Sequence, residues 1–290
     1  MRTKRKRIRT PDDRDYGYEW PEGLQLNYVC SFLSPDARDN PPLVITAENL
    51  RSLNSGEFLD DVAMDIAFDT CVWCAIENRS EIAIMHTHFL DMVASGASRV
   101  MDQGDQMSKM LDAIRRPFRG DKSIVLVPIV GNNHYSVAAF FVIESGDVAM
   151  VIHLDSLSIA HGGHDADEYL SDIWSVIGQA PQKSVRANGV PQQPNLIDCG
   201  AYAIVASKKL IDEASGWRTS DHDYLDTFKV ICRMREKERK EFVSAEHAAG
   251  WIKHPRFMTK KWFTHSDTLR IRETVAEDLL AIARISAINE

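Results

Sequence analysis

Three short segments of this 290-residue sequence carry side chains suited to nucleophilic chemistry. They contain His134, Asp155 and Cys199, and the cysteine is followed directly by Gly200. A cysteine nucleophile needs a base that accepts its proton, and the base needs a group that fixes its orientation. A thiol, an imidazole and a carboxylate would therefore support acyl transfer, provided that the fold brings them together.

Cys199 lies where a helix is expected to begin. It follows Asp198, a residue type that caps helices, and the next residues, 200–205, are small or apolar. A thiol at a helix N-terminus lies beside unpaired N–H groups and the positive end of the helix dipole, which favour the thiolate. We expect Gly200 to leave open space beside the sulfur. The alternative, from this segment alone, is a structural cysteine in the core.

A predicted hairpin supplies the base and its orienting group. Two apolar stretches, 135–143 and 147–154, are joined by a short turn that contains Gly146. A turn centred on 145–146 places Asp155 opposite Ser136. His134 shares a face with Ser136 because side chains alternate along a strand, so imidazole and carboxylate are diagonal neighbours. The alternative is a coincidence between a loop histidine and a strand-end carboxylate.

Acyl transfer also needs hydrogen-bond donors for the developing oxyanion. Gln193 lies six residues before Cys199 in a proline-flanked segment, so its amide could be held toward the sulfur. The backbone N–H of Cys199 would be the second donor. Gln192 competes by position, and spacing alone does not choose between the two glutamines.

The elements that would position these residues follow from hydrophobic periodicity and turn signals. We predict helices over 47–53, 60–76, 81–93, 106–115, 165–178 and 199–214, and strands over 123–130, 135–143, 147–154 and 184–190. Thr46 should cap the first helix, and Pro128 indicates a bulged or edge position in the first strand. This order is typical of an α+β protein with a short, mostly antiparallel central sheet flanked by helices.

The composition is that of a globular protein, with 44% hydrophobic and 26% charged residues, which excludes a disordered chain, a collagen or a coiled-coil rod. No apolar run approaches the roughly 18 residues of a membrane helix. The start, MRTKRKRIRT, lacks the apolar stretch of a secretory signal. We therefore expect an intracellular protein with no membrane partner.

Charge is unevenly distributed. The formal net charge is −8, yet the first ten residues hold six Lys or Arg and no acid. Binding to phosphates needs clustered cations, so we expect no specific nucleic-acid partner for the acidic remainder. Residues 1–22 are predicted to be a flexible basic tail. They are either a solvated arm or an import signal, and the second option predicts a nuclear location, with the cytoplasm as alternative.

Cysteine usage argues against a disulfide framework, since five cysteines lie in a long chain without a signal peptide. Cys71 and Cys74 have CxxC spacing, but no second pair completes a zinc set. Both residues are expected to lie on a helix, with their thiols facing the protein core. Residues 161–164, His-Gly-Gly-His, are interpreted as a solvent loop and the charged run 233–241 as a solvated helix face. No metal and no cofactor are expected.

Together, these residues resemble a known family. The order His134, Asp155, Gln193 and Cys199-Gly200 is similar to that of the ubiquitin-like-protein-specific cysteine proteases, the SUMO-deconjugating group. The segments PQQPNLIDCG and HLDSL extend the resemblance, and ITAENLRSLNSGEFLDD looks like an upstream motif of the family that usually ends in Trp-Leu-Asn-Asp. The resemblance covers about residues 45–214, with thin matching over 77–122.

The resemblance implies a papain-like cysteine protease architecture and assigns roles by position. It makes Cys199 the nucleophile, His134 the base, Asp155 the orienting group and Gln193 the oxyanion donor. Residues 23–215 would form the catalytic domain. Residues 216–290, which are helical and charged in character, would form a C-terminal extension packed on it.

The same resemblance implies a substrate clamp. Tyr135 and Phe58 would hold a Gly-Gly tail between two rings, and Asp61 would orient the tail or its neighbours. The family usually has Trp at both clamp positions, so the identity of the modifier is open. Asp60 stands where the family usually has Asn.

The function implied is that of a monomeric thiol protease that cleaves after the C-terminal Gly-Gly of a ubiquitin-like modifier. SUMO is the modifier that the resemblance favours. Ubiquitin or a Nedd-type modifier is the alternative substrate. Two further alternatives are an acetyltransferase with a similar His-acid-Cys order and a module that binds a modifier without cutting it.

Overall fold

The computed structural model describes residues 23, 25–30, 43–54, 56–76, 81–99, 105–119, 122–159, 162–214 and 222–289. The predicted basic tail, residues 1–22, lies outside the described residues, as does His161. Within the described ranges, no helix combines the length and the apolar character needed to span a bilayer.

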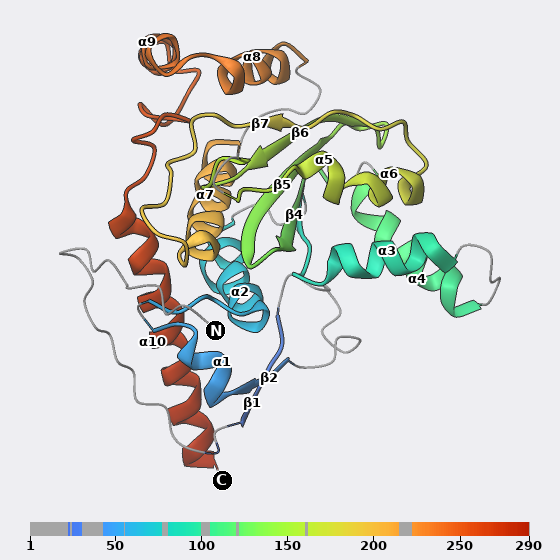
Figure 1. The fold of residues 1–290 in the computed structure, drawn as a ribbon, viewed down its shortest axis with the longest axis vertical. Helices are drawn as coiled ribbons and strands as arrows, with labels where there is room; N and C mark the ends of the chain where they lie inside the picture. The colour runs from blue at the N-terminus through green and yellow to red at the C-terminus, as the bar shows by residue number, and fades with distance from the viewer. Residues whose placement is uncertain are drawn as a thin grey trace, which may run out of the picture.

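A five-stranded sheet in the order β3-β4-β5-β6-β7 forms the centre of the molecule (Figure 1). Its three long strands, β4 (Ile124–Gly131), β5 (His134–Val142) and β6 (Val148–Leu154), are antiparallel, as predicted. The short outer strands β3 (Ile82–Ile84) and β7 (Val185–Arg186) pair in parallel with their neighbours. The sheet is therefore mixed, with the expected antiparallel part at its centre.

Strand register follows the turn chemistry. Val137 pairs with Leu154, so Ser136 and Asp155 come next in line, which confirms the predicted register. Pro128 pairs with Val137 of β5, whereas β3 reaches only residues 124–126 of β4. Pro128 thus has an edge position on its other side, where the missing N–H removes no ladder hydrogen bond.

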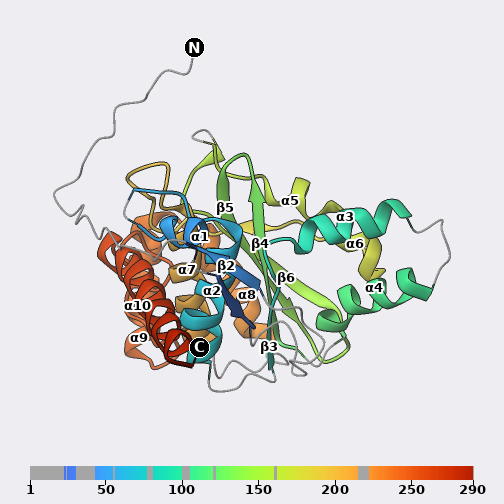
Figure 2. The same cartoon turned by 90° about the horizontal axis from the view of Figure 1, so that it is seen from below.

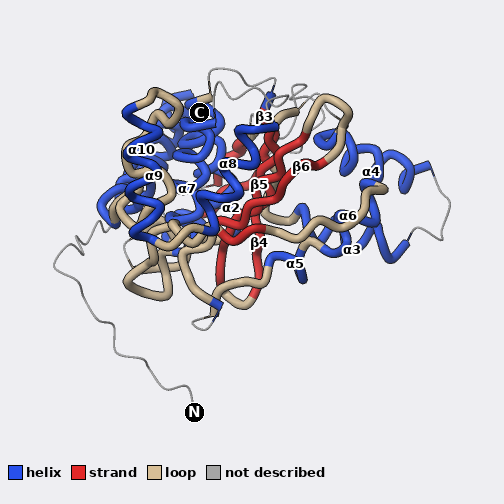
Figure 3. Tube along the Cα trace, turned by 90° about the horizontal axis from the view of Figure 1, so that it is seen from above, coloured by secondary structure: helices blue, strands red, loops and turns tan. Residues whose placement is uncertain are grey.

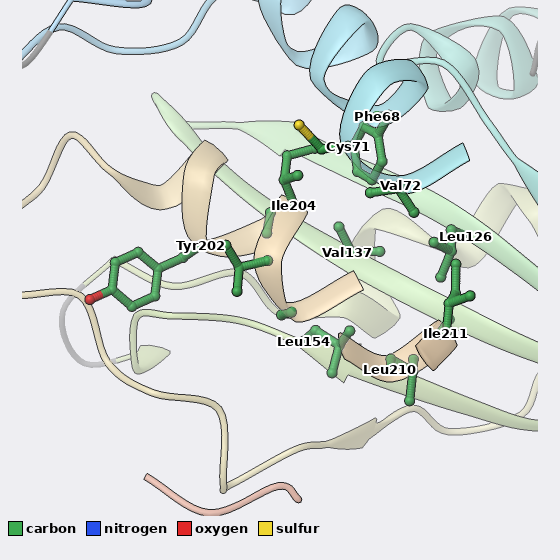
Figure 4. Close-up of a cluster of buried hydrophobic side chains, with 14 of the residues drawn as sticks. Phe68, Cys71, Val72, Leu126, Val137, Leu154, Tyr202, Ile204, Leu210 and Ile211 are labelled. Carbon is green, nitrogen blue, oxygen red and sulfur yellow. The ribbon is translucent and has the colours of Figure 1, made fainter. Parts of the chain in front are cut away.

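Helices cover both faces of the sheet (Figures 2 and 3). One face is covered by α2 (Asp61–Ala67) and α7 (Cys199–Ala214), with α10 (His265–Asn289) packed against these two helices, and the other by α3 (Phe89–Arg99), α4 (Asp105–Arg115), α5 (Ala166–Tyr169) and α6 (Ser171–Ile177). Alternate strand residues enter two separate cores. Val137 and Leu154 pack with Ile204 of α7 (Figure 4), whereas Phe140 packs against Trp174 of α6.

The segment before the sheet departs from the predicted helices. Over 81–93, the structure has β3 followed by α3, because the β-branched run pairs with β4 instead of continuing a helix. The helix predicted over 60–76 changes from α to a π-helical segment, Phe68–Val72, and then to a 3-10 turn, Trp73–Ala75. This change of pitch leaves Cys71 buried and turns Cys74 outward, so the expectation that both thiols face the core is wrong for Cys74.

Two smaller features precede α2. Strands β1 (Gln25–Tyr28) and β2 (Leu43–Thr46), which the sequence analysis did not predict, form an antiparallel pair. Thr46 then caps α1 (Ala47–Arg51) by accepting a hydrogen bond from the N–H of Asn49, as expected.

The C-terminal part continues with α8 (His222–Arg233), α9 (Glu236–Ala248) and α10, and α10 lies beside α2 and α7 (Figure 1). The charged run 233–241 is not a continuous solvated face, because the helix breaks at 234–235. Arg239 is only 1% exposed and donates to the carbonyl oxygens of Ile231 (3.1 Å), Met234 and Met258 (2.8 Å). It thus pairs with carbonyl groups at the end of α8 and with one carbonyl group of the segment between α9 and α10.

Gly189 offers a test of this packing. A Cβ atom at Gly189 would lie 1.2 Å from the carbonyl oxygen of Met258, so backbone would have to move. We expect Gly189→Ala to lower the free energy of unfolding by about 3 kcal/mol in urea titrations followed by circular dichroism. Gly178→Ala is the matched control: its φ of 74° is strained for alanine, but the space is open, so about 1 kcal/mol is expected. Equal losses would contradict the close contact.

Candidate active site

Cys199 is the first residue of α7, as predicted, and its side chain is buried. The unpaired N–H groups at the start of this helix therefore lie beside the thiol. Gly200 does not leave open space, however. A Cβ there would meet Met64 Sδ at 2.6 Å and Leu59 Cδ1 at 3.1 Å, so the glycine instead allows α7 to pack closely against the start of α2.

His134 is placed by a tight turn between β4 and β5. Asn132 and Asn133 both have positive φ, 52° and 56°, and Gly131 pairs with His134 across them. Two left-handed residues in a two-residue loop match the twist of the strands, and asparagine tolerates this conformation well. The turn fixes the imidazole at the first position of β5, where Nε2 lies 2.7 Å from Asp155 Oδ1.

Asp155 follows β6 directly and is surrounded by donors. Oδ1 also accepts from the N–H of Leu157 at 2.8 Å, while Oδ2 accepts from the N–H of His164 at 2.9 Å and lies 3.1 Å from Arg186 Nη2. Burial on its own would raise the pKa of Asp155, but the hydrogen bond and charge of His134 and the N–H of Leu157 lower it below its ordinary value. The buried carboxyl is therefore ionised near neutral pH.

His134 feels both this carboxylate and the thiol. Burial alone would lower the pKa of His134, but the hydrogen bond to Asp155 and the neighbouring negative charges of Asp155 and Cys199 raise it to about 9. Nδ1 makes no hydrogen bond within the described part of the chain. The site favours a charged imidazole, the form that can pair with a thiolate and protonate a leaving amine.

A second buried histidine, His164, packs on His134 with 4.7 Å between ring centroids. Its Nε2 lies 2.9 Å from the carbonyl oxygen of Gly131, which can only accept, so Nε2 carries the proton. Burial lowers the pKa of His164, so its Nδ1 accepts from Ser136 Oγ at 2.8 Å. Ser136 Oγ in turn accepts from His153 Nε2 at 2.9 Å. The three side chains form a directed chain of hydrogen bonds beneath His134.

The sequence analysis placed His164 in a solvent loop, and this was wrong. The loop folds inward because Gly163 approaches its neighbours closely: a Cβ there would lie 2.2 Å from the carbonyl oxygen of Leu157 and 2.8 Å from Asp155 Oδ2. Only glycine permits this approach, which brings the N–H of His164 to the carboxylate. The paired glycines beside the histidine were the available signal.

The two glutamines differ in environment. Gln193 is buried: Oε1 accepts from Ser156 Oγ at 2.5 Å, and Nε2 donates to the carbonyl oxygen of Asn195 at 2.6 Å. Gln192 is exposed, and its Nε2 donates to the carbonyl oxygen of Val190 at 3.1 Å. The amide of Gln193 is thus held in place. One of its two N–H hydrogens is donated to Asn195, which leaves the other able to donate elsewhere.

The two rings of the predicted clamp differ in their exposure to solvent. Phe58 is 44% exposed, whereas Tyr135 is buried and its hydroxyl donates to Asp61 Oδ1 at 2.7 Å. Asp61 therefore fixes the Tyr135 ring. Asp60 caps α2 by accepting from the N–H of Ala63 at 2.8 Å, which gives the acid at this position a structural role.

Asp198, expected as the cap of α7, directs its carboxylate elsewhere. Oδ2 accepts from Asn195 Nδ2 at 2.6 Å, and Oδ1 accepts from Arg272 Nη2 at 3.1 Å. Sequence reasoning missed Arg272, because nothing local marks a residue of the last helix as part of this site. In the described part of the chain, no three His, Cys, Asp or Glu side chains are grouped so that they could hold a metal ion.

Comparison with known proteins adds a family. The sequence model described as Ulp1 protease family, C-terminal catalytic domain, matches residues 61–236. Two curated proteins of Arabidopsis thaliana are similar. Ubiquitin-like-specific protease 1C is 23% identical over 225 residues (68% of this chain, 38% of the relative), and protease 1D is 22% identical over 300 residues (92% and 44%). The chain thus spans less than half the length of these relatives.

A solved structure described as the de-sumoylating protease also matches, with a TM-score of 0.52 and 17% identity. The match covers 92% of this chain and 95% of that one. This likeness shows the shared α+β, papain-like fold, in agreement with the fold class predicted from the sequence.

The buried histidine chain predicts acid sensitivity. Burial lowers the pKa of His153 to about 4, so between pH 6.5 and 4 the unfolded chain binds a proton that the folded protein does not. We expect His153→Gln, which keeps a donor for Ser136, to remove this effect. Relative to the variant, the wild type should lose about 3 kcal/mol of unfolding free energy from pH 6.5 to pH 4. Urea titrations across this range measure the difference, and a constant difference would contradict a neutral buried His153.

Proposed function

This chain belongs to the Ulp1 protease family, and from that premise we propose that it is a thiol protease acting on a ubiquitin-like modifier. It would cleave the peptide or isopeptide bond after the C-terminal Gly-Gly of the modifier, and a SUMO-type modifier is the substrate that we favour. The observation that carries the proposal is the buried hydrogen bond between His134 and Asp155 beside a thiol at the start of α7.

The chemistry follows from these groups. Cys199 sulfur attacks the carbonyl carbon of the last glycine, forming a C–S bond as the C–N bond breaks. His134 gives its proton to the leaving amine, and the Asp155 carboxylate stabilises the charged ring before that step. Water then attacks the thioester with His134 as base, which releases the modifier carboxylate and restores the thiolate.

Two donors would stabilise the oxyanion in both steps. The first is the backbone N–H of Cys199, which is unpaired at the start of α7. The second is Nε2 of Gln193, which Ser156 and Asn195 hold in one orientation. A donor that is already oriented costs no reorganisation when charge develops, which makes it effective in catalysis.

Substrate choice would depend on a narrow slot. A Gly-Gly tail has no side chains and fits between flat rings that exclude bulkier residues. The buried Tyr135, fixed by Asp61, would form one wall, and the exposed Phe58 the other. These rings are smaller than the paired Trp usual in the family, so this site would accept its modifier in a wider slot.

We also propose a division of labour along the chain, with residues 23–215 as catalytic domain and 216–290 as a helical extension. The family match over 61–236 covers most of the first part and runs past residue 215 to include α8, whereas α10 lies beyond it. The basic tail, residues 1–22, would serve nuclear import.

A SUMO protein with a C-terminal electrophile should form a covalent adduct with the protein, detectable as a band shift and by mass spectrometry. Cys199→Ala should abolish the adduct, because the nucleophile is gone. Cys74→Ala, which changes an exposed thiol, is the matched control and should label normally.

Persistent labelling of Cys199→Ala would defeat the assignment of the nucleophile. A parallel panel with ubiquitin and Nedd-type probes ranks the modifiers. Acetyl transfer from acetyl-CoA without cleavage of any modifier would defeat the protease reading, and so would binding of modifiers with no cleavage at all.

Removing the oxyanion donor should lower kcat more than it changes KM. For Gln193→Ala we expect a loss in kcat on the order of 10²-fold, the usual effect of deleting one such donor. Gln192→Ala is the control and should stay near the wild-type value, because its exposed amide donates to the backbone carbonyl oxygens of Val190 at 3.1 Å and, more weakly, Asp155 at 3.4 Å. Steady-state cleavage of a fluorogenic modifier substrate measures both. Equal losses in the two variants would remove Gln193 from this role.

A further inference from the structure

Arg272 is a buried cation that reaches the active-site region from the last helix. It lies on α10, 74 residues after Asp198 in the chain, and is only 1% exposed. In addition to the Asp198 carboxylate, its guanidinium donates to the carbonyl oxygens of Ser52 at 2.7 Å and Glu57 at 2.8 Å. Longer contacts reach the carbonyl oxygens of Asn54 at 3.5 Å and Ile197 at 3.4 Å.

These contacts join two segments that are remote in sequence. One is the loop 52–57, which leads directly to Phe58. The other is the pair Ile197-Asp198, which directly precedes Cys199. Because both segments end at a residue proposed to act on the substrate, one guanidinium sets the distance between nucleophile and clamp.

Asp198 links Arg272 to the loop that precedes α7. Its second carboxylate oxygen binds Asn195 Nδ2, and Asn195 Oδ1 accepts from the N–H groups of Ile197 and Asp198, each at 3.1 Å. The carbonyl of the same Asn195 holds the amide of Gln193. The loop that carries nucleophile and oxyanion donor is therefore tied to α10 by Arg272, and His265, the first residue of that helix, lies 4.0 Å from Asp198 Oδ2.

The chemistry of arginine suits this position. A planar guanidinium offers five donors in a fixed fork, enough for a carboxylate and several carbonyl groups at once, whereas lysine offers a compact point charge. Burial lowers the pKa of Arg272, and the negative charges of Asp198 and Cys199 oppose that effect.

We propose that Arg272 is a positioning residue for the reaction, holding Cys199 and the segment leading to Phe58 in their working arrangement. The inference rests on the proposed function for its meaning in catalysis. It gives α10, which lies beyond the family match, a direct part in the site.

Arg239 provides a matched control within the same chain. It is also 1% exposed and also donates to three carbonyl groups, those of Ile231, Met234 and Met258. None of these belongs to the segments around Cys199 or Phe58. Replacing either arginine by lysine should destabilise the fold, but only one replacement should alter the chemistry.

The test compares Arg272→Lys, Arg239→Lys and Asp198→Asn in the full chain by thermal unfolding, steady-state cleavage and alkylation of Cys199 with iodoacetamide. For Arg272→Lys we expect a loss of about tenfold or more in kcat, a rise in KM and alkylation slowed about threefold, since small displacements of reacting groups have large effects on rate. Arg239→Lys should keep kcat, KM and the alkylation rate within about twofold of wild type, because Arg239 donates to neither the segment before Cys199 nor the segment before Phe58.

Asp198→Asn weakens the contact of Arg272 with the segment before Cys199 and leaves its contacts with the segment before Phe58 in place. It replaces Arg272→Lys in the test if that variant fails to fold. It loosens only the Cys199 side, so kcat and alkylation should fall while KM stays unchanged. If Arg272→Lys, or Asp198→Asn in its place, changes cleavage and alkylation no more than Arg239→Lys does, the positioning role is overturned.

Alkylation needs no modifier, which distinguishes failure of this inference from failure of the proposed function. A wild type that cleaves no modifier would refute the function, while a selective loss of alkylation in Arg272→Lys would still support the positioning role.

Discussion

The burial of the Asp155 carboxylate is the constraint around which this site is built. A buried charge is costly unless donors surround it, and here they come from four parts of the chain. His134 reaches it from β5, Leu157 from the turn after β6, His164 from the glycine loop and Arg186 from β7. The short parallel strand β7 and the inward loop therefore both contribute donors to this carboxylate, and the carboxylate in turn binds the imidazole of His134.

A second buried ion pair, Arg272 with Asp198, lies directly before Cys199 in the chain. The two pairs differ in what they bind. Asp155 accepts a hydrogen bond from the His134 imidazole, whereas Arg272 binds the backbone and the carboxylate that directly precede Cys199. The helix α7 begins at Cys199, so the N–H groups of its first turn lack helical partners near the sulfur. Both ion pairs are buried, so water screens their charges little.

How far the sequence alone leads is clear from particular residues. His134, Asp155 and Cys199 were found because a hairpin and a helix start are local patterns, with a period and a turn that fix the register. The order of the central strands followed in the same way. His164 was misplaced because its burial depends on Gly163 meeting another loop, and β3 was taken for a helix because three apolar residues fit either period. Cys74 turned outward because a π-helical segment shifts the phase of the helix, a change that periodicity does not encode.

The buried arginines show why such residues escape sequence analysis and what would reveal them. Arg239 and Arg272 both donate to backbone carbonyl groups at a helix end or in an irregular loop. The carbonyl groups lie in one segment, near 231–234 or 52–57, and the arginine that binds them comes from another segment. No local sequence pattern therefore contains both the donor and the acceptors. Because nearly every buried carbonyl must be paired, a buried arginine marks a place where backbone from separate segments converges. In this protein one of those places lies directly before the nucleophile, which is why the last helix belongs to the description of the site.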